Sequence, residues 1–255
     1  MLSVDRTNSI RQLLIKNKSV SVAELSKMFG VSGETIRRDI NKIVNEDPMV
    51  LRVHGGACRI APDSDLPYSF RESSKIEEKK RIAAACLEEI NDGDYVFLDG
   101  STTTLYLSKL IATSNMSLNV ITNSLGIVNE LCSNENIKII GLGGKYTDKS
   151  HSFVGNTTLS QLVDLFAEKS FVSCSGIDMR FGITHNNEEE AAIRRSMLLN
   201  SKKRYLLIDS NKFGRCKMHR IITADNVDII FTETSPSAEW IDFFEKNKIE
   251  LKVCK

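Results

Sequence analysis

The chain has 255 residues, 41% of them hydrophobic and 26% charged, which is typical of a globular protein with one large domain or two smaller ones. The net charge of +1 conceals an asymmetry that favours a DNA-binding domain joined to a different one: residues 1–60 hold 10 Lys and Arg against 6 Asp and Glu, and the remainder holds 24 against 27. The six cysteines form no CxxC pair, and no signal peptide or membrane-spanning run is visible, so we expect a cytoplasmic protein without metal, cofactor or membrane partner.

Two short helices are predicted before residue 31. Residues 6–17 carry apolar side chains at helical spacing, and Ser21 with Glu24 fits a capping box that opens a second helix. Gly30 stands where a residue with positive φ can end that helix. The apolar stripes comprise Ile10, Leu13 and Leu14 in the first helix and Val22, Leu25 and Phe29 in the second.

Residues 32–41 predict a third helix with one apolar face and one polar, basic face. Ser32 is a good N-cap, and isoleucines recur at positions 36, 40 and 43. Arginines on the opposite face can bond phosphates and guanine edges in the major groove. A solvated surface helix has a similar pattern, but the order helix, glycine turn, helix favours a helix-turn-helix. The candidate DNA-binding residues here are Ser32, Glu34, Thr35, Arg37, Arg38 and Asn41.

Residues 49–57 form an extended run that ends in a Gly-Gly turn. We expect a hairpin, or wing, that lays Arg52 and His54 against the DNA backbone. For His54, a turn residue that bonds its own backbone is an alternative.

Residues 6–57 resemble the winged helix-turn-helix of the DeoR family of bacterial transcriptional regulators. The resemblance rests on Ser32-x-x-Thr35-Ile36-Arg37-Arg38-Asp39-Ile40 and on Arg52-Val53-His54-Gly55-Gly56-Ala57. It implies that Thr35, Arg37 and Arg38 contact DNA. Asp39, which phosphate would repel, is expected to orient an arginine or to cap a neighbouring helix.

Residues 59–74 contain prolines, aspartates and serines without periodicity, which predicts a linker. We therefore assign residues 1–58 to the DNA-binding domain and 75–255 to a second domain. This second domain is expected to open with a helix over about 75–90, with its Glu and Lys side chains outside. The inner positions of this helix are Ile76, Ile82, Ala83, Leu87 and Ile90.

After residue 91, short apolar runs alternate with helix-like segments, which predicts an α/β domain on a mostly parallel sheet. Ligands of such sheets bind outside the carboxyl ends of the strands, so the residues that follow each strand are candidate site residues. The expected strands are 95–98, 118–122, 137–142, 170–174, 205–208 and 228–232, and the expected helices are 105–111, 125–132, 159–166, 189–200 and 238–247.

The predicted strand ends repeatedly offer glycine, hydroxyl, amide, carboxylate and lysine groups. Residues 99–104 can surround a phosphate with hydroxyls and helix amides, although an ordinary cluster of N-capping residues has the same pattern. Several such loops converging on one crevice would suit a phosphorylated polyhydroxy molecule. The candidate ligand-binding residues are Asp99, Gly100, Ser101, Thr102, Thr103, Asn123, Gly144, Asp178, Asp209 and Lys212.

The same loops resemble the effector domain of the DeoR family, which is similar to the sugar-isomerase and CoA-transferase sheet fold and typically senses a phosphorylated sugar. The resemblance gives residues 99–103 the role of a phosphate loop. Two departures stand out. The loop reads Asp-Gly-Ser-Thr where Asp-Ser-Gly-Thr is a common family form, and Ser175 stands where many members have a carboxylate. The second departure weakens the case for retained isomerase chemistry.

We therefore predict a transcriptional regulator of carbohydrate metabolism genes, most often a repressor in this family, with no catalytic residues. Its partners would be a double-stranded DNA operator, a phosphorylated sugar, and further copies of the chain in a dimer or tetramer. The main alternative is a phosphosugar isomerase-like enzyme that carries the helix-turn-helix, with Asp99 and Asp178 as the strand-end candidates for its base. A third possibility is a DNA binder whose pocket is unused.

Overall fold

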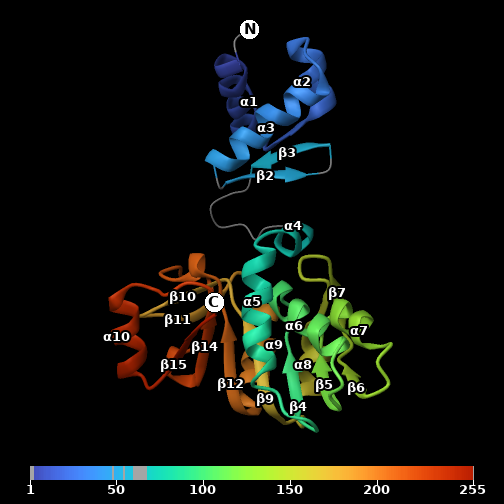
Figure 1. Cartoon of the computed structure of the whole chain (residues 1–255), viewed down its shortest axis with the longest axis vertical. Helices are drawn as coiled ribbons and strands as arrows, with labels where there is room; N and C mark the ends of the chain where they lie inside the picture. Colours follow the sequence, from blue (N-terminus) through green and yellow to red (C-terminus); the bar gives the residue numbers. More distant parts are fainter. Residues whose placement is uncertain (1–2, 48, 54, 60–67, 255) are drawn as a thin grey trace. The chain divides into compact units, whose positions relative to one another are not determined.

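The computed structural model describes residues 3–47, 49–53, 55–59 and 68–254, and the chain divides into two compact units, residues 1–66 and 67–255 (Figure 1). The division falls inside the segment predicted as a linker. Residues 68–73 of that segment form a helix that the sequence analysis did not predict. Across the described ranges, no helix is both long enough and apolar enough to span a membrane.

The N-terminal unit consists of three helices and a small antiparallel sheet (Figure 1). The sheet has the order β1-β3-β2, and its β2–β3 hairpin is the predicted wing. The elements are α1 (Ser3–Asn17), β1 (Ser19–Ser21), α2 (Val22–Phe29), α3 (Gly33–Glu46), β2 (Val50–Val53) and β3 (Gly56–Arg59).

Local sequence signals fix the helix ends of this unit. The Ser21 hydroxyl accepts a hydrogen bond from the Glu24 amide at 3.1 Å, and Gly30 ends α2 with a φ of +62°. A Cβ on Gly56 would lie 2.0 Å from the Val20 carbonyl oxygen, so the β1–β3 approach requires glycine. The core consists mainly of Ile10, Leu14, Leu25, Ile36, Ile40 and Ile43.

The C-terminal unit is built on a seven-stranded sheet in which all neighbouring strands run parallel. The strand order is β15-β14-β12-β9-β4-β5-β6, so the chain moves outward from β4 through β6 and then continues on the other side of β4 with β9. The order therefore reverses between β4 and β9, which is where open parallel sheets bind ligands. The strands are β4 (Tyr95–Leu98), β5 (Leu118–Thr122), β6 (Ile137–Gly141), β9 (Ala167–Ser173), β12 (Ser201–Leu207), β14 (Ile229–Thr232) and β15 (Glu250–Val253).

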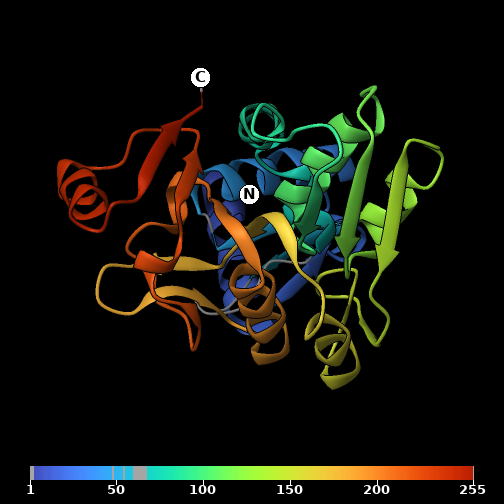
Figure 2. The same cartoon turned by 90° about the horizontal axis from the view of Figure 1, so that it is seen from below.

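Helices cover both faces of this sheet because its strand side chains alternate between two apolar clusters. Val96 and Leu98 join the cluster of α5, α6 and α7, whereas Phe97 joins that of α8, α9 and α10. Figure 2 shows the teal helix α5 and the orange helix α9 on opposite sides of the strands. The helices are α4 (Tyr68–Ser73), α5 (Ile76–Leu87), α6 (Thr102–Ala112), α7 (Leu125–Leu131), α8 (Asn156–Leu162), α9 (Glu188–Leu199) and α10 (Ala238–Lys246).

Short elements surround the carboxyl ends of the sheet and were not predicted. A hairpin, β7–β8, follows β6, and a separate antiparallel sheet has the order β10-β11-β13. The strand β15 was also missed, because its four residues show no apolar run. The additional elements are β7 (Lys145–Thr147), β8 (Ser152–Val154), β10 (Gly176–Asp178), β11 (Gly182–His185), β13 (His219–Ile222) and the short 3-10 helices Ser210–Lys212 and Ala224–Asn226.

Candidate functional site

The start of α3 presents the predicted DNA-reading residues. The Ser32 hydroxyl accepts a hydrogen bond from the Thr35 amide at 3.2 Å and lies 2.9 Å from the Thr35 hydroxyl. Ser32 therefore caps the helix and orients Thr35 at its exposed first turn. The N-cap predicted from sequence is confirmed.

The arginines of α3 are exposed, and each forms a weak ion pair with Glu34. Arg37 Nη1 is 3.4 Å from one Glu34 oxygen, and Arg38 Nε is 4.0 Å from the other. The Arg38 side chain is 81% exposed. Exposed pairs of this kind contribute about 0–1 kcal/mol, so an incoming phosphate or base can displace Glu34 at little cost.

A hydrogen bond joins the wing to α3. Arg52 Nη1 on β2 donates to Asn41 Oδ1 on α3 at 3.0 Å, and both residues are exposed. The contact brings two predicted DNA-binding residues together on one surface. His54 lies outside the described residues, so its predicted role stays a prediction.

Asp39 is turned away from this surface. Its carboxylate accepts hydrogen bonds from Arg6 Nε at 2.6 Å and Arg6 Nη2 at 3.3 Å, and both side chains are buried. The prediction that Asp39 orients an arginine is confirmed. Because Arg6 belongs to α1, this pair fixes the reading helix against the first helix.

The second site lies at the reversal of strand order between β4 and β9. Asp99, which follows β4, is buried and accepts hydrogen bonds from the Ser173 amide at the end of β9 (3.2 Å) and from Arg194 Nε on α9 (2.6 Å). Its other oxygen accepts from the Ser101 amide at 3.2 Å and the Thr104 hydroxyl at 3.0 Å. Both oxygens are thus bound by protein groups, and Asp99 joins the ends of β4 and β9 to α9.

Arg194 connects this carboxylate to a second one. Its Nη1 donates to Glu190 at 2.9 Å, one helical turn earlier on α9. Burial alone would lower the pKa of Arg194, but Asp99 and Glu190 outweigh burial and raise that pKa. The guanidinium is therefore a permanent buried cation that holds α9 to the end of β4.

The predicted phosphate loop opens α6. The Ser101 hydroxyl caps the helix by accepting from the Thr104 amide at 3.1 Å, and Thr102 and Thr103 form the first, buried turn. A Cβ on Gly100 would lie 2.0 Å from the Ser152 hydroxyl, so glycine lets the β7–β8 hairpin cross this loop. The N-capping and the phosphate interpretations of the sequence are compatible here, because the early amides of a helix attract anions.

Basic side chains gather beside this loop around one carboxylate. Asp209, after β12, lies 2.6 Å from Lys75 Nζ and 3.6 Å from Lys212 Nζ. Lys212 Nζ also donates to the Ser173 hydroxyl at 3.0 Å. Burial raises the pKa of Asp209, but Lys212 and Lys75 outweigh this effect and lower it to about 2. Two cations thus share one permanent anion.

A third lysine, Lys79 on α5, is buried in the same region. Its ammonium contacts the carbonyl oxygens of Arg71, Ser74 (2.7 Å) and Glu72 (3.4 Å) at the end of α4. Burial and then the charge of Lys212 lower the pKa of Lys79 to about 8. The prediction that the lysines of this helix lie outside is wrong for Lys79, which lies on the same helical stripe as Ile76 and Ile82.

His185, on β11, faces the same buried network as a neutral ring. Its Nδ1 accepts a hydrogen bond from the Asn187 amide at 3.1 Å, so the proton is on Nε2, which lies 3.6 Å from Glu190. Burial, then Arg194 and Arg71, lower the pKa of His185 to about 2. The ring therefore remains uncharged at neutral pH.

The remaining predicted ligand residues have different surroundings. Asn123 Nδ2 donates to the Phe153 carbonyl at 2.8 Å, beside the β7–β8 hairpin. Gly144, with a φ of +155°, packs against Thr158 of α8. Asp178 accepts hydrogen bonds from the amides of its own β10–β11 turn, at residues 180 and 181. These contacts do not join Gly144 or Asp178 to the lysines, and the ligand roles of both residues stay predictions.

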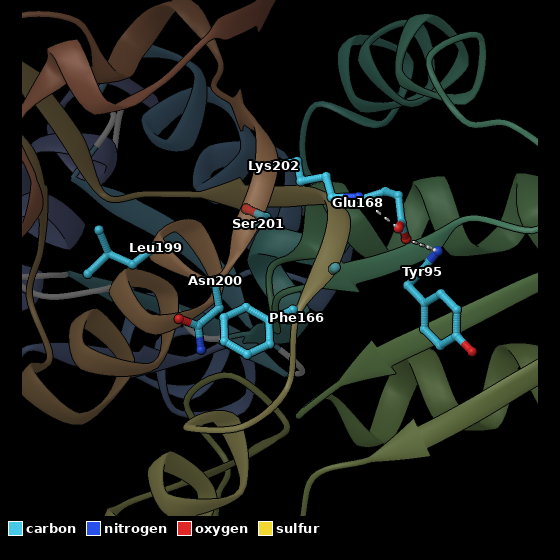
Figure 3. Close-up of a pocket in the computed structure, with 8 residues that line it drawn as sticks. Tyr95, Phe166, Glu168, Leu199, Asn200, Ser201 and Lys202 are labelled. Carbon is cyan, nitrogen blue, oxygen red and sulfur yellow. Dashed lines mark hydrogen bonds and ion pairs between the residues drawn. The ribbon is translucent and has the colours of Figure 1, made fainter.

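A cavity of about 450 Å³ lies at the opposite edge of the sheet, where β4, β9 and β12 begin (Figure 3). Glu168 accepts the Tyr95 amide hydrogen at 2.9 Å and lies 3.5 Å from Lys202 Nζ, so the charged side chains there already pair. None of the predicted site residues lines this cavity. Its lining comprises Tyr95, Phe166, Ala167, Glu168, Leu199, Asn200, Ser201 and Lys202.

Comparison with known proteins identifies both units. A DeoR-like helix-turn-helix domain matches residues 6–62, and a DeoR C terminal sensor domain matches residues 74–234. The chain belongs to the DeoR family. The predicted winged helix-turn-helix followed by an α/β effector domain is therefore confirmed.

Full-length relatives of this DeoR-family chain are transcriptional regulators by name. The HTH-type transcriptional regulator YulB of Bacillus subtilis is 34% identical over 252 residues, covering 98% of this chain and 96% of the relative. The glycerol-3-phosphate regulon repressor of Escherichia coli is 31% identical over 255 residues and covers all of both chains. Among solved structures, ribose 5-phosphate isomerase A from Methanocaldococcus jannaschii is 12% identical, covers 55% of each chain and has a TM-score of 0.41.

Several polar groups of the DeoR sensor domain escaped sequence reasoning. Lys79 had a usable signal, because it interrupts an apolar stripe at helical spacing. Arg194 and Glu190 stand one turn apart on a predicted helix, but this spacing is equally typical of an exposed pair. Lys75 and Ser173 gave no signal, since their roles depend on partners far away in the sequence.

Proposed function

We propose that this DeoR-family chain is a transcriptional repressor that binds operator DNA through α3 and the wing and whose sensor domain binds a phosphorylated sugar. The observation that supports sugar-phosphate binding is the group of basic side chains at the strand-order reversal. Lys75 and Lys212 flank the Asp209 carboxylate there, and the buried Lys79 is bonded to the end of α4 within range of the charges of Lys212 and Asp209. Such a surplus of positive charge favours a phosphate dianion.

Lys212 and Lys79 would have different roles toward that phosphate. Lys212 is held by Ser173 and Asp209 and would supply a direct ammonium contact. Lys79 is bound to the end of α4 and would attract the phosphate by its buried positive charge without a direct contact. Burial, and after it the repulsion from Lys212, lowers the pKa of Lys79, and an anion would relieve that repulsion.

We further propose that the crevice binds its ligand without catalysis. An isomerase needs an accessible base of matched pKa beside a carbon acid. Both oxygens of Asp99 are already engaged, and Asp178 is bonded within its own turn. Asp209 has a pKa of about 2, and position 175 is a serine. The strand-end carboxylates singled out from the sequence therefore serve structure and charge balance.

Regulation would follow from linkage. A ligand shifts DNA affinity only if it binds one arrangement of the regulator better than another. We propose a homo-oligomer, acting in the cytoplasm, in which two α3 helices read half-sites about 34 Å apart. The modest positive charge of residues 1–60 supports this, because a single copy would make few phosphate contacts.

The proposal is tested by titrating the purified full chain onto its own promoter DNA at fixed salt, with and without sugar phosphates. Salt is fixed because phosphate contacts make the affinity strongly dependent on ionic strength. We expect specific binding that one sugar phosphate weakens and that the corresponding free sugar leaves unchanged.

Two results would contradict the proposal. If the chain binds DNA specifically and no member of a broad panel of sugar phosphates alters this binding, the proposed control by a sugar phosphate is wrong. Conversion of a sugar phosphate to its isomer by the purified chain, with no specific DNA binding, would favour the enzyme instead.

A further inference from the structure

Two buried polar atoms of the sensor domain stand out by having no hydrogen-bond partner within the described residues. They are Asn123 Oδ1 and Ser150 Oγ. Asn123 is 4% exposed and Ser150 is 1% exposed. Buried polar atoms are almost always bonded, and each exception requires a physical explanation.

Both atoms belong to one small region. The Phe153 amide donates to the Asn123 carbonyl at 2.8 Å, and Asn123 Nδ2 donates back to the Phe153 carbonyl at 2.8 Å. The Leu125 amide donates to the His151 carbonyl at 3.1 Å. The turn between β7 and β8, which carries Ser150, is therefore bonded to the loop after β5, which carries Asn123.

The same turn also crosses the phosphate loop. The Ser152 hydroxyl donates to the Ser150 carbonyl at 2.8 Å and occupies the space where Gly100 has no Cβ. The Ser150 carbonyl oxygen lies 3.7 Å from that Cβ position. Ser150 and Asn123 thus lie at the edge of the proposed phosphate site and away from its lysines in sequence and contacts.

The chemistry of the two atoms indicates what would satisfy them. An amide oxygen only accepts hydrogen bonds, whereas a serine hydroxyl both donates and accepts. A phosphate dianion has no hydrogen to donate to Asn123, but a sugar hydroxyl can donate to the amide and accept from the serine. We propose that Asn123 and Ser150 form a subsite for a hydroxyl group of the sugar, distinct from the phosphate contacts; this inference rests on the proposed function.

The position of the turn gives the subsite a regulatory consequence. Because both atoms are buried, a ligand hydroxyl reaches them only when the turn shifts. The turn is held by helix α4: Tyr68 stacks on His151 with ring centres 4.2 Å apart, and Arg71 Nη2 donates to the Lys149 carbonyl at 2.5 Å. The sugar hydroxyl would therefore bind to the turn that contacts α4. This helix is the first described element after the DNA-binding unit.

Ser150→Ala tests the subsite, with Ser108→Ala as the matched control. Ser108, on α6, is fully buried, but its hydroxyl donates to the Leu105 carbonyl at 2.8 Å. Removal of an unpartnered hydroxyl should leave the ligand-free protein as stable or more stable, whereas removal of a bonded one should lower its melting temperature. A merely structural role for Ser150 would give the second result.

Ligand affinity is measured on the full-length chain by calorimetry with inorganic phosphate, glycerol 3-phosphate, a hexose 1-phosphate and a hexose 6-phosphate. We expect Ser150→Ala to bind the sugar phosphate preferred by the wild type about three- to tenfold more weakly, the effect of one lost hydrogen bond. Its affinity for inorganic phosphate should be unchanged, and Ser108→Ala should match the wild type for both probes.

Three outcomes would overturn the assignment. Equal affinity of Ser150→Ala and wild type for the sugar phosphate would remove the subsite and leave the proposed function standing. An equal loss for inorganic phosphate would place Ser150 in the phosphate site. If the wild type binds none of the sugar phosphates, both the proposed function and the subsite are wrong.

Discussion

Arg38 on the reading helix and Arg194 at the strand-order reversal are the same residue type in opposite surroundings. Arg38 is 81% exposed, and its pair with Glu34 spans 4.0 Å. Arg194 is 5% exposed and contacts two carboxylates at 2.6 and 2.9 Å. The exposed arginine is available to a partner, whereas the buried one is committed to the fold. Whether a basic residue of this chain can bind a partner therefore depends on whether carboxylates of the protein already neutralise its charge.

The largest expected effect is on the stability of the sensor domain. Arg194→Ala leaves two buried carboxylates without their cation, which should lower the free energy of unfolding by about 3–5 kcal/mol. Denaturant unfolding followed by circular dichroism measures the change. Arg38→Ala is the control and should stay within about 0.5 kcal/mol of the wild type. Similar losses in the two variants would contradict the comparison.

The next effect is on ligand binding. If Lys212 holds the phosphate as proposed, Lys212→Ala should weaken sugar-phosphate binding about 10- to 100-fold, with DNA binding intact. Lys202→Ala, at the opposite edge of the sheet and largely exposed, removes the same charge without effect. A Lys212 variant that responds at the wild-type ligand concentration would show that this lysine does not hold the phosphate.

Operator affinity should depend on the exposed arginines. Arg38→Ala should weaken specific operator binding by about 1–3 kcal/mol without altering the response to ligand. Electrophoretic or fluorescence titration at fixed salt gives the value, and Lys16→Ala on α1 is a control for lost charge. Unchanged operator affinity would exclude Arg38 from the reading surface.

The last effect is a pH dependence with two opposite signs, and its change in binding is the smallest of the series. The pKa of Lys79 is lowered by burial from 10.5 to about 8, so unfolding takes up a proton between those values and stability should rise with pH there. Anion affinity should instead fall above pH 8, by about threefold from pH 7 to 9, as the ammonium loses its charge. Lys79→Met should abolish both trends; an unchanged pH profile in this variant would assign them to other groups.

Much of the N-terminal unit could be predicted because its signals are local. Ser21, Gly30 and Ser32 act on backbone groups within a few residues, and the isoleucines of α3 follow the helical period. The alternation of strands and helices in the sensor domain could also be predicted from local sequence patterns. Its candidate site could be anticipated only as a set of strand ends. The interpretation of Lys79 as an outer residue was wrong because the α4 carbonyls that bind it were not foreseen.

The sequence by itself determined the two-part organisation, the helix caps and the parallel α/β class. The tertiary structure alone decided which charges meet. Asp99 pairs with a residue 95 positions away, and Lys75 with one 134 positions away. These contacts depend on the order in which the strands lie in the sheet, which places β9 beside β4. Because periodicity and capping act over a few residues and carry no information on strand order, only the folded sheet shows which polar groups are paired with one another.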